Sequence, residues 1–277
     1  MPRDTHDPGV ADAVAHVRDR FETEPLLGFI LGSGLGSFAE EVSNPVMIPT
    51  AEIPKYPAST VPGHAGRLVC GDIDGIPVVI VQGRVHAYEG YPLERVVFPV
   101  RLLAALGVGA LVVTNASGCT HDGLHPGDLM AIRDQVNLMG VNPLVGQHWG
   151  FDRFPDMSRA YDPDLLTVLQ QTAREQDIPL KEGIVGAWIG PTYETSAEVR
   201  LLRSIGVDAA CMSTIPEVIA AARLRVRVAG VSCITNYATG VSDRAHSHDE
   251  VVETAGRVEH TFRALLREAV KPLADAL

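Results

Sequence analysis

The chain has 277 residues, of which 46% are hydrophobic, and its 23 Lys and Arg against 34 Asp and Glu give a formal net charge of −11. The apolar content excludes a disordered or low-complexity chain, because such chains lack the surface whose burial offsets chain entropy. The acidic balance excludes a general nucleic-acid binder, since phosphate backbones require a basic face. Any anionic ligand must be held by a few local cations and backbone amides.

The N-terminal segment and the cysteines predict a cytoplasmic protein. Residues 1–7 (MPRDTHD) lack the apolar stretch of a secretory signal, and no run approaches the roughly 18 apolar residues of a membrane span. Cys70, Cys119, Cys211 and Cys233 form no CxxC pair and lie in apolar or glycine-rich runs, which is typical of buried thiols in a reducing compartment. We therefore expect neither a membrane nor a nucleic acid as partner.

Helical and strand-like patterns alternate along the first half of the chain. Apolar spacing predicts a helix from Val10 to about Phe21 and another over residues 93–103, which Gly107 closes. Uninterrupted apolar runs predict buried strands at residues 26–31, 78–81 and 111–113.

The second half repeats this alternation. We predict a helix after Asp162 and strands over residues 183–189 and 226–236. Capping boxes that begin at Thr195 and Ser247 predict two further helix starts. Such alternation is typical of a three-layer α/β/α domain. Because no linker or composition step divides the chain, we expect a single domain over residues 1–277, with residues 1–8 flexible.

Polar residues gather where the predicted strands stop. Open α/β sheets bind their ligands at the carboxyl ends of strands. Six residues follow predicted strands in this way: Ser33, Arg84, His86, Asn115, Glu194 and Asn236.

The segment GSGLG at 32–36 admits two interpretations. Its third glycine comes one position early for GxGxxG, no Gly-Lys-Ser/Thr follows, and Leu31 stands where a nucleophile elbow needs glycine. The segment is therefore either a tight turn between strand and helix or a loop whose amides and Ser33 hydroxyl hold a phosphate-sized anion.

Two histidine pairs, His121 with His125 and His246 with His248, suggest metal ligands. The intervening glycine and the following proline prevent the first pair from sharing a helical face, and neither pair is joined by a cysteine or carboxylate at ligand spacing. We expect no metal site.

The segment GRVHAYEGY at 83–91 places Arg84, His86 and Tyr88 on one face of an extended chain. Core packing does not call for this trio, whereas a surface hairpin or a dianion site does. In a dianion site Arg84 would act as a bidentate fork and His86 as a second donor.

Two later segments carry further candidates. Tyr193 and Glu194 form either a solvated loop or an aromatic wall with a hydrogen-bond acceptor for a planar heterocycle. Ser213 precedes a helix start and offers a second anion contact, while capping alone explains Thr214 and Glu217.

Together these segments resemble the trimeric, low-molecular-mass class of purine nucleoside phosphorylases. Nine motifs occur in family order over nearly the whole chain: LGSGLG (31–36), VPGHAG (61–66), QGRVHAYEGY (82–91), TNASG (114–118), DRFP (152–155), GPTYET (190–195), MST (212–214), ITN (234–236) and SHDEV (247–251). The resemblance implies a mixed, twisted central sheet flanked by helices and a homotrimer. It also implies reversible phosphorolysis of purine nucleosides to the base and the sugar 1-phosphate, with inorganic phosphate as co-substrate and no cofactor.

The resemblance assigns the site residues by position. Phosphate would contact Ser33, Arg84, His86, the Ala116 backbone amide and Ser213, with His64 at the mouth of the site. The ribose would contact Tyr88, Met212, His248 and, from a neighbouring subunit, Phe154; the purine would contact Tyr193, Glu194 and Asn236. Asn236, Glu194, His86 and His248 are the expected catalytic residues.

These residue types suit cleavage through an oxocarbenium-like sugar, in which an aligned phosphate supplies both stabilising charge and nucleophile. One amide lets Asn236 donate to O6 and accept from a protonated N7. Glu194 would accept from N1–H of a 6-oxopurine, which favours inosine and guanosine over adenosine. Related methylthioadenosine phosphorylases carry aspartate where Asn236 stands. The helix dipole predicts a neutral His248 that binds the 5′-hydroxyl.

Two residues depart from the family pattern, since Cys119 and Cys211 stand where glycine is usual. Their added volume beside the base pocket would retune purine choice. Three other interpretations stay open at this point. They are a 5′-methylthionucleoside phosphorylase, which needs an apolar pocket in place of His248; a hydrolytic nucleosidase, which leaves the anion-binding set unused; and a non-catalytic nucleoside sensor.

Overall fold

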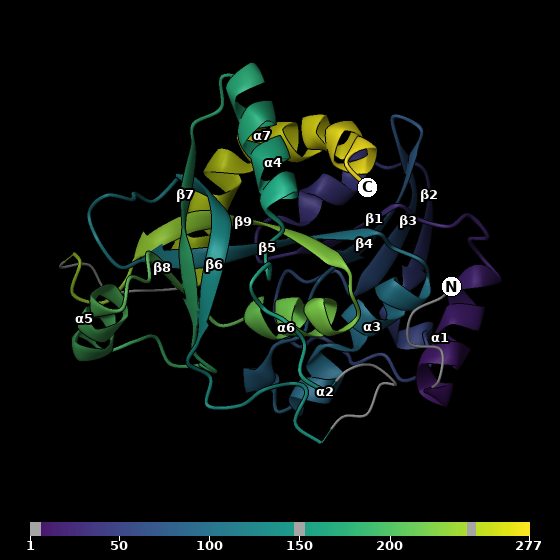
Figure 1. Ribbon diagram of the computed structural model, residues 1–277, viewed down its shortest axis with the longest axis horizontal. Helices are drawn as coiled ribbons and strands as arrows, with labels where there is room; N and C mark the ends of the chain where they lie inside the picture. Colours follow the sequence, from purple (N-terminus) through teal and green to yellow (C-terminus); the bar gives the residue numbers. More distant parts are fainter. Residues whose placement is uncertain (1–6, 147–152, 243–247) are drawn as a thin grey trace.

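The computed structural model describes residues 7–146, 153–242 and 248–277, apart from the side chain of His248. In these ranges the strands form one mixed sheet, ordered β2-β3-β4-β1-β5-β8-β7-β6-β9 (Figure 1). The strands are β1 (Leu27–Leu31), β2 (Ser43–Pro49), β3 (Arg67–Ile73), β4 (Ile76–Gln82), β5 (Ala110–Cys119), β6 (Leu129–Asn137), β7 (Leu180–Ala187), β8 (Ala209–Cys211) and β9 (Arg227–Tyr237).

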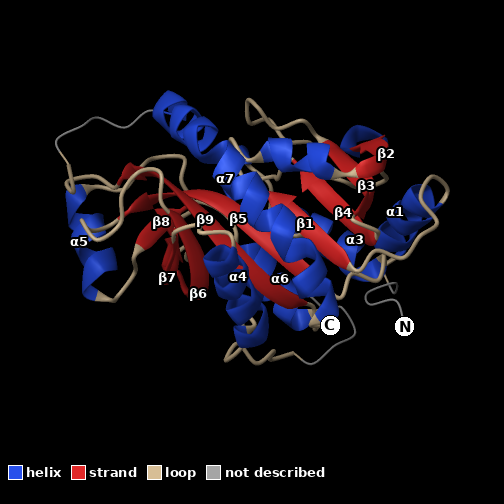
Figure 2. Cartoon of the chain, turned by 90° about the horizontal axis from the view of Figure 1, so that it is seen from above, coloured by secondary structure: helices blue, strands red, loops and turns tan. Residues whose placement is uncertain are grey.

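Helices cover both faces of this sheet. They are α1 (Pro8–Arg18), α2 (Leu93–Val96), α3 (Phe98–Ala105), α4 (Pro163–Glu175), α5 (Ser196–Ser204), α6 (Ile215–Arg223) and α7 (His248–Asp275). Helices α4 and α7 pack together on one face, α1, α3 and α6 lie on the other, and α5 lies beyond β8 (Figure 2). The predicted three-layer α/β/α arrangement with a mixed sheet is confirmed. No helix in the described ranges is long and apolar enough to cross a membrane.

Part of the sheet closes on itself, which the sequence patterns did not predict. β5 pairs with β8 on one side and with β9 on the other, while β9, β6, β7 and β8 pair in succession. Closure depends on β8, which is three residues long and leaves too short a pattern to recognise.

Helix starts follow the predicted capping chemistry, with one correction. The Asp162 side chain caps α4, and Thr195 forms the predicted capping box at α5. Asp7 caps α1, which begins at Pro8. The predicted helix over 93–103 is two helices, because Pro99 has no N–H to continue the ladder of α2.

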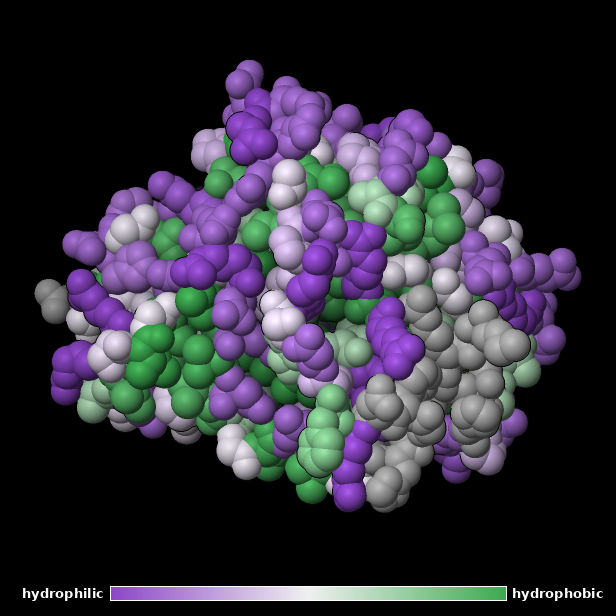
Figure 3. Space-filling model, in the orientation of Figure 1, coloured by the Kyte–Doolittle hydropathy of each residue, from purple (hydrophilic) through white to green (hydrophobic). Residues whose placement is uncertain are grey.

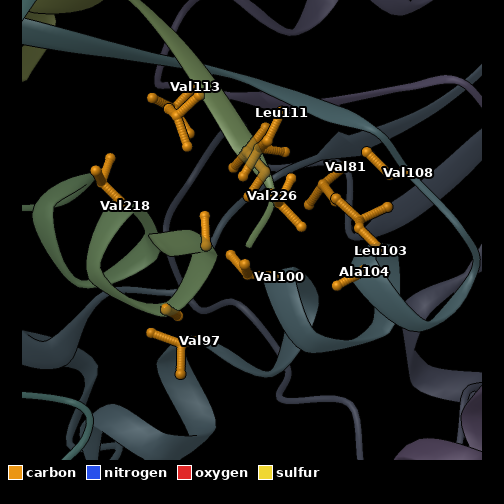
Figure 4. Packing of buried hydrophobic residues seen from close by; sticks show 14 of the residues in the cluster. Val81, Val97, Val100, Leu103, Ala104, Val108, Leu111, Val113, Val218 and Val226 are labelled. Carbon is orange, nitrogen blue, oxygen red and sulfur yellow. The ribbon is translucent and has the colours of Figure 1, made fainter. Parts of the chain in front are cut away.

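Two buried clusters join the layers, one on each face of the sheet. On the α3 and α6 face, Val81 and Leu111 from the sheet lie close to Leu103 of α3, and Val113 lies close to Val218 of α6 (Figure 4). Each fully buried side chain of this kind contributes about 1.5–3 kcal/mol relative to exposure.

Four adjacent strands, β4, β1, β5 and β9, are parallel, so their carboxyl ends meet at one edge of the sheet. One of them is longer than predicted, since β5 continues to Cys119. β9 spans Arg227–Tyr237, close to the predicted residues 226–236, so both Asn115 and Asn236 lie within strands and do not follow them. Pairing with β9 explains the extension of β5, because the ladder carries β5 past its apolar run. A bulge between Ser117 and Gly118 then brings Gly118 opposite Asn236.

Candidate active site

A cavity of about 450 Å³ opens at the carboxyl edge of the parallel strands. Sequence-predicted residues from six segments line it: Ser33, Arg84, His86, Tyr88, Ala116, Tyr193, Glu194, Met212, Ser213 and Asn236. Thr60, Glu89 and Ser117 also line the cavity and were not predicted. Segments more than two hundred residues apart in sequence, from Ser33 to Asn236, thus share one pocket, as the resemblance requires.

Three predicted residues stand apart from this lining. His64 is not a lining residue, but its ring stacks on that of His86 at a centroid distance of 5.5 Å. Phe154 is 87% exposed and lines a different hollow, so within one chain it does not contact the cavity. The side chain of His248 lies outside the described residues, although His248 begins α7 as the predicted cap position requires.

Arg84 is held at the inner end of the cavity by a buried ion pair. Its Nε donates to Oε1 of Glu217 at 3.0 Å and its Nη2 donates to Oε2 at 2.7 Å. Its Nη1 donates to the Thr114 carbonyl oxygen and reaches the Ser213 hydroxyl at 3.3 Å. The Nε–Nη2 edge of the predicted fork is therefore already paired, and the Nη1 side lies next to Ser213.

A strained turn presents Ser213 beside Arg84. Thr214 has φ +68° and ψ −53°, and the Ile215 amide donates to the Ser213 carbonyl at 2.7 Å, which together define a γ-turn with positive φ. A β-branched residue adopts this conformation only when its surroundings impose it. Here the Asn115 amide donates to the Thr214 hydroxyl at 2.8 Å.

Capping does not explain Thr214 or Glu217, and that prediction is wrong. Thr214 occupies the N-cap of α6 yet makes no side-chain cap hydrogen bond, because its γ-turn directs the hydroxyl to Asn115. The Glu217 carboxylate turns away from the helix end toward Arg84. The first amides of α6 consequently keep no side-chain cap beside Ser213.

His64 links the glycine-rich turn to the arginine segment. Its Nδ1 lies 2.7 Å from the Arg84 carbonyl oxygen, which can only accept, so Nδ1 carries the proton. Its Nε2 then accepts from the Ser33 hydroxyl at 3.3 Å. Burial, and next to it repulsion from a protonated His86, lowers the pKa of His64 to about 4, so the ring is neutral at pH 7.

His86 is held by Glu89. The Glu89 carboxylate accepts from the His86 backbone amide at 2.7 Å and lies 3.3 Å from Nδ1 of the ring. The Tyr88 ring stacks on His86 at 4.7 Å. Burial lowers the pKa of His86, although the Glu89 contact opposes this shift. Burial would raise the pKa of Glu89, but hydrogen bonds from His86 and Thr60 hold it at about 2.

The predicted base-binding residues line the same cavity. Burial raises the pKa of the Glu194 carboxyl, and the backbone amide of Glu194 partly offsets this shift. Tyr193 beside it is 37% exposed. The Asn236 carbonyl oxygen accepts from the Thr235 hydroxyl at 2.9 Å and its amide donates to the Tyr237 carbonyl at 3.0 Å. The side-chain oxygen of Asn236 can accept a second hydrogen bond, and its side-chain nitrogen can donate a second one.

The two cysteines that depart from the family pattern are both buried, but only Cys211 lines the cavity. The Cys119 thiol donates to the Leu124 carbonyl oxygen at 3.3 Å, behind the base end. Burial raises the pKa of the Cys211 thiol to about 11, so it is a neutral, space-filling group there.

Histidines outside the cavity have ordinary partners. His121 lies 3.1 Å from an Asp208 carboxylate oxygen, and His125 lies 3.0 Å from the Tyr237 hydroxyl. Across the described ranges no three His, Cys, Asp or Glu side chains gather as a metal site. His246 lies outside those ranges.

Sequence reasoning missed Glu217, Asn115 as a support for Thr214, and Glu89. For Glu217 a signal exists: it is the single acidic residue in IPEVIAAAR, a helix that is apolar apart from Glu217 and the terminal Arg223, and it is 3% exposed. A carboxylate on such a helix requires a buried partner. Nothing in the sequence singles out Glu89, whose role depends on the fold of residues 59–64 around it.

Comparison with known proteins places this fold and pocket in a class. The model of the phosphorylase superfamily matches residues 27–271, so the chain belongs to that superfamily. It is 49% identical over 261 residues to purine nucleoside phosphorylase 1 of Bacillus subtilis, covering 93% of this chain and 96% of the relative. Solved complexes of the Schistosoma mansoni purine nucleoside phosphorylase with inosine and with adenosine match with TM-score 0.90 at 34% and 36% identity, covering 95% of this chain and 96% of theirs. The chain is a purine nucleoside phosphorylase, and the predicted family and activity are confirmed.

Proposed function

We propose that the inner end of the cavity binds inorganic phosphate through Ser33, Arg84, His86, Ser213 and the backbone amide of Ala116, with His64 supporting Ser33. The observation that carries this proposal is that Ser33, Arg84, His86, Ala116 and Ser213 all line one cavity, with Arg84 Nη1 3.3 Å from the Ser213 hydroxyl. At pH 7 both histidines are neutral, so Arg84 supplies the positive charge and the others supply hydrogen bonds. This fits an acidic chain that must bind an anion locally.

We assign the nucleoside to the remaining lining of the cavity. Tyr88 and Met212 would contact the ribose, and Tyr193, Glu194 and Asn236 would contact the base; all five residues line the cavity. His248 is assigned to the 5′-hydroxyl from its place at the start of α7. A phosphate oriented toward the anomeric carbon attacks as the C–N bond breaks, and Asn236 stabilises the departing purine through O6 and N7.

The preferred substrates are the 6-oxopurine nucleosides inosine and guanosine. Glu194 as a carboxylate accepts a hydrogen bond from N1–H, whereas adenosine presents an unprotonated N1 and leaves buried acceptors unpaired, at about 1–3 kcal/mol each. This preference distinguishes our proposal from equal use of both purine classes.

The decisive experiment follows inosine cleavage with and without phosphate, measures ribose 1-phosphate, and repeats the assay with adenosine. We expect cleavage only with phosphate and at least tenfold higher kcat/KM for inosine. Base release that is unchanged without phosphate would indicate hydrolysis. Equal kcat/KM for adenosine would overturn the assignment of Glu194.

The Asn236→Asp variant tests the second base contact. We expect it to raise the ratio of adenosine to inosine turnover, because a protonated aspartate can donate to N7 while it no longer donates an amide hydrogen to O6. No change in this ratio would contradict the role of Asn236.

We also propose a homotrimer in which Phe154 covers the ribose of a neighbouring subunit. Phe154 and Val145 are 87% and 77% exposed around one hollow. On the face that Figure 3 shows, hydrophobic residues gather near the lower ends of β6 and β7, whereas the region of α4 is mainly hydrophilic. Exposed apolar clusters of this kind mark interaction surfaces. Light scattering measures the mass, and Phe154→Ala should raise the KM for inosine without altering the KM for phosphate.

The protein is proposed to act in the cytoplasm. Its four cysteines are free and buried, as expected in a reducing compartment.

A further inference from the structure

We propose that Glu217 is a positioning residue for phosphate binding, which acts through Arg84 and makes helix α6 the common support of two phosphate contacts. The inference rests on the proposed phosphate role of Arg84. It assigns to Glu217 a role in the reaction although its carboxylate does not line the cavity.

The geometry of the pair determines where the guanidinium points. Both Glu217 oxygens are used, with Nε and Nη2 of Arg84 donating at 3.0 and 2.7 Å in a bidentate contact. Both side chains are almost fully buried, at 1% and 4% exposure. A planar guanidinium clamped along one edge cannot rotate, so its Nη1 side is fixed beside Ser213 and Thr114.

Helix α6 supplies both halves of this arrangement. Ser213 immediately precedes its N-cap, and Glu217 lies in its first turn, so a single rigid element spaces the Ser213 hydroxyl from the carboxylate that holds Arg84. The apolar side chains Val218 and Ile215 of the same helix are buried in the core, which fixes α6 against the sheet. A phosphate that contacts Ser213 and Arg84 therefore meets a preset spacing and orders neither side chain on binding.

Net charge alone predicts that removal of the Glu217 carboxylate strengthens phosphate binding, because a carboxylate beside the phosphate site repels a dianion. A buried guanidinium that loses its partner, however, has no acceptor for its Nε–Nη2 edge, and its remaining Nη1 contacts with Thr114 and Ser213 do not fix its orientation. We infer that orientation outweighs repulsion here, because the pair is desolvated and bidentate.

The first test measures steady-state kinetics of Glu217→Gln with phosphate and inosine varied separately. Gln keeps the length of the side chain but offers one acceptor in place of two. We expect the KM for phosphate to rise about tenfold, and the KM for inosine to change less than twofold. Glu217→Asp keeps the charge but is one methylene shorter, and we expect its KM for phosphate to lie between those of the wild type and of Glu217→Gln.

A matched control separates positioning from loss of stability. Asp162 makes the equivalent bidentate pair with Arg227, at 2.8 and 3.0 Å, away from the cavity. Asp162→Asn therefore also removes one charge from an arginine–carboxylate pair. We expect a lower melting temperature from both variants but a raised KM for phosphate only from Glu217→Gln. An unchanged or lower phosphate KM in Glu217→Gln overturns the proposal.

A double-mutant cycle tests whether Glu217 acts through Arg84. If it does, Arg84→Gln and the double variant Arg84→Gln with Glu217→Gln should have the same phosphate KM. Additive increases would overturn the inference. An Arg84→Gln variant with wild-type phosphate KM would instead refute the proposed phosphate role of Arg84, so the two failures are distinguishable.

Discussion

The part of the cavity that we propose binds phosphate (the phosphate end) and the part that we propose binds the purine (the base end) are built differently. At the phosphate end, each polar side chain is held by another: Arg84 by Glu217, His86 by Glu89, and Ser33 by His64. At the base end, Tyr193 is 37% exposed and the Glu194 carboxyl is supported by its own backbone amide.

This difference indicates at which stage the side chains of each end become ordered, during folding or on ligand binding. The phosphate end is ordered during folding, so a small ion of fixed shape meets preset donors and acceptors. The base end has spare hydrogen-bonding positions on Asn236 and a desolvated Glu194, which a purine completes. Changes at the base end should therefore alter substrate choice, whereas changes at the phosphate end should alter phosphate affinity.

Gly118→Ala should have the largest effect on activity, because it displaces Asn236 at the base end. A Cβ at this position would lie 2.9 Å from the Asn236 amide nitrogen, so Asn236 must move. We expect kcat/KM for inosine to fall at least 100-fold with the phosphate KM nearly unchanged. Gly256→Ala is the control, because a Cβ there meets no atom within 4 Å, and it should retain full activity. Wild-type activity of Gly118→Ala would disprove the requirement for Asn236.

Glu194→Gln should reduce kcat/KM for inosine about 10- to 100-fold, since a charged hydrogen bond contributes about 1.5–3 kcal/mol. Adenosine, which has no N1–H, should lose much less. Parallel kinetics on the two nucleosides check this, and equal losses would show that Glu194 does not read the base.

Asn115→Ala tests the phosphate end through the γ-turn at Thr214. Without its amide, the γ-turn at Thr214 loses the contact that holds it in a strained conformation. We expect the phosphate KM to rise about three- to tenfold and the inosine KM to stay within twofold. A change confined to the inosine KM would contradict the separation of the two ends.

The smallest expected effect is on the stability of the folded chain at low pH, which should depend on titratable residues of the phosphate end. The pKa of His64 is about 4 in the folded chain and near 6.5 when unfolded, so falling pH protonates the unfolded state first and stability is lost between these values. Glu89, with a folded pKa of about 2 against 4.5, adds a loss between pH 4.5 and 2. His64→Asn should flatten the first loss in melting temperature measured against pH; an unaltered profile would exclude His64 as its source.

Much of the fold and most of the pocket could be predicted from local patterns. Buried strands leave uninterrupted apolar runs, and helix starts at Asp162 and Thr195 depend on side chains a few residues away. The end of β5 could not be predicted, because its last residues form a strand only by pairing with β9 and β8. Residues 84 and 217 are separated by 133 positions, so no local pattern reports their contact.

By itself, then, the sequence determined most of the elements and the layer arrangement, because these depend on local spacing and residue chemistry. It also indicated the family and the candidate binding residues, through the resemblance of its motifs to a known family. Only the tertiary structure decided how those residues support one another: the closed part of the sheet, the Glu217–Arg84 pair, and the γ-turn held by Asn115. The physical reason is that buried polar groups must find partners wherever the packed chain provides them, at any distance in sequence.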